Sequence, residues 1–208
     1  MRYVNLAIKG LARGMSKPSG AEKDGRRLRG ERSRQAILEA ALALMEEGNL
    51  VPTAQQISAR AGVGIRSFFR HFEDMETLFK VADEHIRDSY EALFIGGERS
   101  GTIERRIERC VECRAEAYER VSNMVLCSRA QLWRYETLRK NYARAQRGLR
   151  KDLEGWLPEI TSMSRDVYEA VDVIASFDTW NRLREHQGQS KKSSIDIVSG
   201  LMKRLILD

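Results

Sequence analysis

Apolar side chains recur at intervals of three and four residues along most of the chain, which is the spacing of one face of an α-helix. From Ser33 onward this pattern includes Ile37, Ala40 and Ala41 and ends near Gly48. No stretch shows the strict alternation typical of a β-strand. The pattern therefore predicts an all-α fold of about nine helices.

Two short predicted helices follow, joined by a tight turn at Gly62. Thr53 and Gln56 have the spacing of a capping box, in which each side chain bonds the backbone amide of the other. In the second helix Phe68 and Phe72 are four residues apart and are expected to face inward, leaving the polar and basic residues between them outside. This arrangement predicts a helix-turn-helix, whose second helix enters the major groove of DNA.

Beyond it, Asp74 is expected to cap a longer helix, and further amphipathic helices are expected at about residues 102–122, 124–135, 136–157, 164–186 and 193–208. We predict an N-terminal three-helix helix-turn-helix domain and a C-terminal helical ligand-binding and dimerisation domain. The expected boundaries are a flexible basic arm at 1–30, a DNA-binding domain at 31–78 and an effector-binding and dimerisation domain at 79–208.

The N-terminal block resembles the tetracycline-repressor (TetR) family. The resemblance covers the apolar helix 37–45, the segments 53–57 and 61–63, and above all the sequence SFFRHF at 67–72, followed by Leu78. The stretch 180–188, followed by a final helix, looks like the family's usual ending. The resemblance implies a dimeric, all-helical repressor whose C-terminal body binds a small effector that weakens DNA binding.

The resemblance also implies which residues of the helix-turn-helix contact DNA: Thr53, Gly64, Ile65, Arg66, Ser67, Phe69, Arg70 and His71. Arg66 is expected to read guanine and Ile65 a thymine methyl group. Two alternatives stay open. His71 is instead a helix-end residue that packs on Phe72, and Arg70 is instead a solvated or ion-paired arginine.

Two positions depart from the family pattern. The family commonly has Tyr where this chain has Phe69, and the lost hydroxyl removes one phosphate bond, which is worth about 0.5–1.5 kcal/mol. A Lys often stands where this chain has Met75, with the acidic Glu73 and Asp74 beside it. We expect the basic segment before the first helix to compensate for these losses.

Positive charge is concentrated at the N-terminus. Residues 1–34 contain ten Lys and Arg against three acidic residues, whereas the whole chain has a net charge of +6, so the remainder carries −1. A basic arm on a near-neutral body is typical of a polyanion binder. Arg26, Arg27 and Arg34 are the candidate DNA contacts of this segment. A solubilising tail, or a start at Met15 rather than Met1, is the alternative.

Aromatic residues between about 100 and 160 suggest an effector pocket, although aromatics at helical spacing are also typical of plain core. The candidate pocket residues are Cys113, Tyr118, Trp133, Tyr135 and Trp156. The predicted helix 164–186 carries two apolar stripes. We expect one stripe to pack inside the subunit and the other to contact a partner subunit. The candidate dimer-interface residues are Val173, Phe177, Trp180, Ile195, Val198 and Met202. A fully buried helix in a monomer is the alternative.

Few residues of the sequence indicate metal binding, redox chemistry or catalysis. Cys110 and Cys113 form a single CxxC, and the three histidines are scattered, so we expect ordinary helix cysteines and no metal or cofactor; redox sensing is the weaker alternative. No phosphate loop, nucleophile elbow or histidine–carboxylate cluster supports an enzyme. No apolar run approaches the roughly 20 residues of a membrane span, which favours a cytoplasmic protein.

The helix-turn-helix thus predicts a sequence-specific DNA-binding transcriptional regulator, and the resemblance implies a repressor released from a palindromic operator by a small-molecule effector. The alternative is a helical DNA-binding or interaction scaffold without an effector. The operator, the effector, the choice between repression and activation, and the number of dimers on one operator cannot be derived from the residues.

Overall fold

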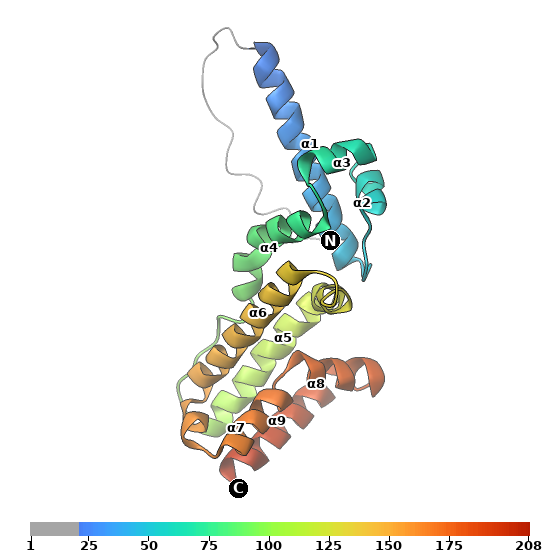
Figure 1. Cartoon of the computed structure of the whole chain (residues 1–208). Coiled ribbons are helices and arrows are strands. Elements are labelled where there is room, and N and C mark those ends of the chain that lie inside the picture. Colours follow the sequence, from blue (N-terminus) through green and yellow to red (C-terminus); the bar gives the residue numbers. More distant parts are fainter. Residues whose placement is uncertain (1–20) are drawn as a thin grey trace.

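The computed structural model describes residues 21–208, and over this range every regular element is helical (Figure 1). The predicted all-α class with about nine helices is confirmed. The helices are α1 (Ala21–Glu46), α2 (Ala54–Arg60), α3 (Ile65–His71), α4 (Met75–Glu91), α5 (Ile103–Ala130), α6 (Glu136–Trp156), α7 (Arg165–Ile174), α8 (Phe177–Asn181) and α9 (Lys191–Leu207). A 3-10 helix (Pro158–Ser162) follows α6, and a π-helical turn (Arg182–His186) follows α8.

Helices α1, α2 and α3 gather at one end of the molecule, and α5 to α9 form a bundle at the other, with α4 between them (Figure 1). The three N-terminal helices and the start of α4 share one apolar core. Its fully buried side chains are Ile37, Ala41, Ile57, Phe68, Phe72 and Leu78. These are the faces that the sequence pattern predicted to point inward, because a three-helix domain can bury each amphipathic helix only along its apolar stripe.

Helix α1 starts at Ala21, well before the expected start near Ser33. Part of the segment that we expected to be a flexible arm is therefore helical, while residues 1–20 lie outside the described residues. No apolar stripe marks this extension. Once α1 is nucleated by its buried part, further residues add at little cost, and the pair Arg27–Glu31 (3.1 Å) spans one turn of the extension.

The C-terminal bundle is built around α5, which packs against α1, α6, α8 and α9. We expected two helices where α5 runs unbroken to Ala130. The polar pair Ser122 and Asn123 is accommodated within it, because the Ser122 hydroxyl donates to the Tyr118 carbonyl (2.8 Å) and the Asn123 amide donates to the Glu46 carbonyl of α1 (2.7 Å).

The expected single helix 164–186 is instead broken at Ala175. Helix α7 ends at Ile174, and Ser176 begins α8 by accepting a bond from the Thr179 amide (3.3 Å). The last helix starts at Lys191 and is capped by Ser190, not by Ser193 or Ser194. Among the described residues, no helix is long and apolar enough to cross a membrane.

Candidate DNA-binding surface and internal cavity

Helix α3 divides its side chains between the core and solvent. Phe68 and Phe72 are fully buried, whereas Ile65 is 41% and Phe69 53% exposed. Arg66 and Arg70 are exposed on the same outer side as these two apolar residues. Two phenylalanines thus hold α3 against the core, and its outer side presents arginines and apolar side chains. Arginines bond base edges and phosphates, and apolar side chains contact thymine methyl groups, so α3 is suited to be a recognition helix.

The turn that positions α3 has the predicted local chemistry. The Thr53 hydroxyl accepts a bond from the Gln56 amide (3.2 Å), and the Gln56 side chain accepts one from the Thr53 amide (2.9 Å), so the capping box at the start of α2 is present. Gly62 has φ +67°, a left-handed conformation that side chains rarely adopt. Gly64 is the N-cap of α3 without a side chain over the first turn.

Basic side chains gather at the C-terminal end of α3. Arg70 donates to the Ser67 hydroxyl (3.0 Å) and lies 3.5 Å from Nε2 of His71. Arg34 of α1 lies over the Phe72 ring, 5.1 Å from its centroid. Partial burial, followed by the charges of Arg70 and Arg34, lowers the pKa of His71 below its usual range. The fold therefore brings Arg34, which is distant in sequence, to the predicted phosphate-contacting residues.

The other residues of the basic segment lie further along α1. Arg27 is exposed and paired with Glu31, and the Arg26 side chain lies outside the described side chains. Asp74, on the acidic edge after α3, accepts a bond from the Thr77 amide at 2.7 Å and so caps α4. Capping of the α4 N-terminus therefore explains why an acidic residue stands at this position, because a cap stabilises the start of a helix.

The family comparison coincides with this domain. Residues 37–82 match the model described as bacterial regulatory proteins, tetR family. The chain belongs to the TetR family of transcriptional regulators. It is accordingly a DNA-binding protein of a regulatory, non-enzymatic family, as the helix-turn-helix predicted.

Solved structures described as transcriptional regulators share the fold over most of this chain. A protein of Streptomyces coelicolor A3(2) described as a transcriptional regulator is 21% identical, with a TM-score of 0.57 over 85% of this chain and 99% of its own. A Rhodococcus sp. protein described as a TetR-family regulator is 19% identical, with a TM-score of 0.59 over 84% of this chain and 98% of its own. No curated protein matches the sequence significantly.

A cavity of about 640 Å³ lies between α4, α5 and α6. Of the five residues predicted for an effector pocket, Tyr118 is the one that lines it. Trp133 is 80% exposed in the turn after α5. Tyr135 packs edge-on against Phe79 in the core of the DNA-binding domain, with 5.0 Å between the ring centroids. Trp156 is fully buried in the bundle. These placements correct the prediction, since helical spacing does not distinguish a cavity wall from a packed core.

Cys113, the fifth predicted pocket residue, lies beside the cavity but not in its wall. Its thiol approaches the carbonyls of Leu93 (3.9 Å) and Phe94 (3.8 Å), and Phe94 is itself a wall residue. Burial raises the pKa of the Cys113 thiol, and that of Cys110 to about 11. Within residues 21–208 no histidine, cysteine and carboxylate group is arranged as a metal site. The burial of both thiols disfavours their thiolate forms.

The wall residues that the sequence analysis missed are aromatic side chains on α4, α6 and the loop after α4: Tyr90, Phe94 and Tyr142. They stand on or next to amphipathic helices, but helical spacing alone did not single them out. Only the placement of α4 against α6 shows that these faces leave a space between them.

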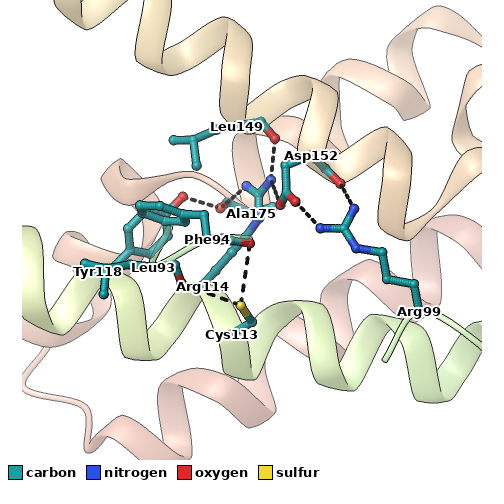
Figure 2. Close-up of polar contacts among 9 residues, drawn as sticks. All are labelled: Leu93, Phe94, Arg99, Cys113, Arg114, Tyr118, Leu149, Asp152 and Ala175. Carbon is teal, nitrogen blue, oxygen red and sulfur yellow. Dashed lines mark hydrogen bonds and ion pairs between the residues drawn. The ribbon is translucent and has the colours of Figure 1, made fainter. Parts of the chain in front are cut away.

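Arg114 connects α5 to α6 and to the end of α7 (Figure 2). Its side chain is buried and donates to the Leu149 carbonyl of α6 (2.5 Å) and the Ala175 carbonyl (3.1 Å). It also lies 3.5 Å from the Asp152 carboxylate, which Arg99 contacts at 2.5 Å from the other side. The Tyr118 hydroxyl donates to the same Ala175 carbonyl (2.9 Å). The break between α7 and α8 is thus bonded to a cavity wall residue.

Most of the predicted dimer-interface residues are internal to the protomer. Phe177, Trp180, Val198 and Met202 are buried within the chain itself, and Ile195 is half-buried. Their side chains are not available to a partner, which corrects the prediction. The break after α7 turns α8 inward, so that Phe177 packs against Tyr118 (5.6 Å). Val173 differs, since it is 63% exposed.

Proposed function

We propose that the protein is a homodimeric repressor that binds an inverted-repeat operator in the cytoplasm and is released from it by a small-molecule effector. The proposal rests on the family and on one observation. The cavity reaches the core of the DNA-binding domain, because Met45, Phe79 and Leu138 belong both to its wall and to the cluster that buries Phe68 and Phe72.

This shared wall supports coupling between ligand and DNA. A ligand in the cavity contacts side chains that pack behind α3, so that it favours one placement of α3 over another. A ligand shifts an equilibrium only through such a difference in contacts between the two states. The alternative scaffold, without an effector, predicts a filled core; the cavity of about 640 Å³ favours an effector.

On DNA, we assign base contacts to Ile65 and Arg66. We assign phosphate contacts to Thr53, Ser67, Arg70 and His71, with Arg34 beside them. Phe69 is exposed and has no hydroxyl for a phosphate. The extended α1, with Arg27 and Arg26, supplies positive charge that compensates for this loss.

A dimer is required because two recognition helices must meet successive major grooves about 34–36 Å apart. Val173 of α7 and Leu201 and Leu207 of α9 are exposed, so these two helices carry apolar surface. We propose that the partner subunit covers this surface.

The deciding experiment is selection of bound duplexes from a random DNA pool by the full chain, followed by sequencing. We expect an inverted repeat among the selected sequences, and weaker binding to it by an Arg66→Ala variant. Selected half-sites without symmetry would contradict the dimer. No enrichment with folded protein would contradict sequence-specific binding and favour the scaffold.

A further inference from the structure

The wall that α5 contributes to the cavity is largely apolar. Tyr118, Val121 and Val125 line it with buried or half-buried side chains. This wall extends from Tyr118 to Ser128, ten residues further or about 15 Å at 1.5 Å per residue. The Tyr118 hydroxyl is already bonded to the Ala175 carbonyl (2.9 Å). The apolar part of a ligand therefore gains from burial against α5.

The wall that α6 contributes is basic. Arg144, Arg147 and Lys151 line the cavity from this helix, and their spacing of three and four residues places them on one face. Arg147 and Lys151 are exposed, so they stand at the rim of the cavity. Over the described part of the chain, neither of these two side chains has a hydrogen bond or an ion pair. The rim therefore carries two positive charges that no carboxylate of the described chain neutralises.

Arg144 is only partly neutralised by the carboxylates around it. It donates to Asp83 at 2.8 Å, but Asp83 also accepts a bond from Arg87 at 2.5 Å. Two arginines thus share one carboxylate, and this group keeps one positive charge. The Arg144 Nε is buried and bonds no acceptor within residues 21–208. The exposed Glu91 carboxylate lies 4.0 Å from this nitrogen, which is beyond hydrogen-bond distance.

Asp152 does not supply the missing negative charge. Arg99 contacts this carboxylate at 2.5 Å, and Arg114 lies 3.5 Å from its other oxygen (Figure 2). Two arginines again share one carboxylate. Asp172, which also interacts with Arg114, is itself paired with Arg150 at 3.7 Å.

The positive charges at the cavity therefore exceed the negative ones. The wall has four cationic side chains against three carboxylates, and the two arginines that hold Asp152 raise the difference from one to three. An anionic group at the rim is attracted by this excess, and its partial exposure there keeps its loss of hydration small. The same excess repels a cation. The cationic wall residues are Arg87, Arg144, Arg147 and Lys151, and the carboxylates are Asp83, Glu91 and Asp152.

We propose that the cavity binds an amphipathic organic anion, whose apolar body lies against α5 and whose anionic group lies beside Arg147, between Arg144 and Lys151. The inference rests on the proposed function, since it names the chemical class of the effector. It adds that a neutral molecule of the same length binds more weakly, and a cation more weakly still.

The test is isothermal titration calorimetry of the full-length protein, without DNA. Three compounds share a decyl chain and differ in charge: decanoate, decanol and decyltrimethylammonium. We expect decanoate to bind about tenfold more tightly than decanol, because charge-assisted hydrogen bonds to the unpaired cations add to the same apolar burial. Decyltrimethylammonium is expected to bind least. Absence of decanoate binding, or decanoate binding no tighter than that of decanol, would overturn the proposal.

Two pairs of substitutions separate the rim from the overall charge of the protein. Arg147→Ala combined with Lys151→Ala is expected to weaken decanoate binding about tenfold and to change decanol binding less than about twofold, since only the anion uses these cations. Arg182→Ala combined with Lys192→Ala removes the same charge from exposed positions outside the cavity and leaves both affinities unchanged. Equal losses of decanoate binding in the two pairs would contradict the proposal.

A further variant locates the apolar body of the ligand. Val121→Phe fills space beside α5 and is expected to weaken the binding of decanoate and decanol alike, because it removes cavity volume. Val125→Phe on the same wall serves if Val121→Phe does not fold, as judged by circular dichroism. Val51→Phe, the same change at an exposed residue outside the cavity, is the control. Undiminished decanoate binding by a folded cavity variant would place the ligand elsewhere and overturn the proposal.

The same compounds separate this inference from the proposed function. If decanoate binds as expected but leaves operator binding unchanged, effector release is contradicted and the ligand class stands. If decanol or decyltrimethylammonium releases the operator at a lower concentration than decanoate, effector release stands and the ligand class is contradicted.

Discussion

At the residue scale, two side chains show how local surroundings change the chemistry of an ordinary residue. Arg114 is buried in the bundle, where two carbonyls and a carboxylate replace its water. His71 lies at the end of α3, where partial burial, and after it the charges of Arg70 and Arg34, disfavour its protonated form. The first arrangement concerns stability, and the second concerns contact with DNA.

Arg114→Leu is expected to lower the free energy of unfolding by about 3 kcal/mol or more, because it leaves the Leu149 and Ala175 carbonyls with one partner fewer and removes a buried ion pair. Urea denaturation followed by circular dichroism measures the loss. Arg105→Leu, on the same helix but 73% exposed in its side chain, is the matched control and should change stability little. Equal losses would show that the buried bonds of Arg114 stabilise the fold no more than an exposed arginine does.

His71 gives a pH dependence. Its pKa lies below the ordinary value of 6.5 in the free protein, so its contribution to stability is full above that value and is lost as the pH falls through the lowered pKa. A phosphate beside the ring favours the protonated form, so DNA binding raises this pKa and takes up a proton. Operator affinity should therefore rise as the pH falls through this range, and a His71→Asn variant should lose that component. An unchanged His71 titration by NMR on adding operator would contradict the phosphate contact.

At the scale of the element, helix boundaries depended on what lay next to them. The capping box and the turn at Gly62 formed as predicted, because these motifs satisfy their own backbone groups within a few residues. The extension of α1 and the break after α7 did not follow from the pattern. The first has no apolar stripe to reveal it, and the second is bonded from α5 by Arg114 and Tyr118.

The extension of α1 makes a prediction about salt dependence. Arg26→Ala combined with Arg27→Ala is expected to reduce the slope of log affinity against log salt by about 2, since each lost phosphate contact removes about 0.9. Titration of the selected operator at several salt concentrations measures this slope. Arg182→Ala with Lys192→Ala removes the same charge from exposed positions in the bundle and should leave the slope nearly unchanged. A slope that responds equally to both pairs would show a general charge effect.

At the scale of the whole molecule, the three N-terminal helices and the bundle are joined through α4 and through the contact of α5 with α1. The cavity lies at this junction and takes its wall from both parts. The two parts are therefore joined by packed side chains, which supports the proposed coupling between ligand and DNA. Helices α7 and α9 carry exposed apolar residues, and we propose that a second subunit covers this surface.

Val173→Glu tests that surface. We expect it to shift the protein from dimer to monomer and to weaken operator binding, because it places a carboxylate in an apolar interface. Sedimentation velocity over a range of concentrations measures the equilibrium. Val51→Glu, another exposed valine outside the bundle, is the control. A dimer as stable as that of the unaltered protein would place the interface elsewhere.

The sequence by itself determined the all-helical class, the helix-turn-helix and the division of α3 into a buried and an exposed face. These features depend on periodicity, capping and turn residues, which act over a few positions of the chain. Phe68, Phe72 and Gly62 therefore lie as predicted.

Only the tertiary structure decided which aromatic side chains line the cavity and which apolar residues remain at the surface. Trp133 and Trp156 were both predicted to line the pocket, yet one is exposed and the other fully buried. The break after α7 likewise moved Phe177 and Trp180 from an expected interface into the core. Such outcomes depend on how distant helices pack, and helical spacing shows which residues share a face but not what covers that face.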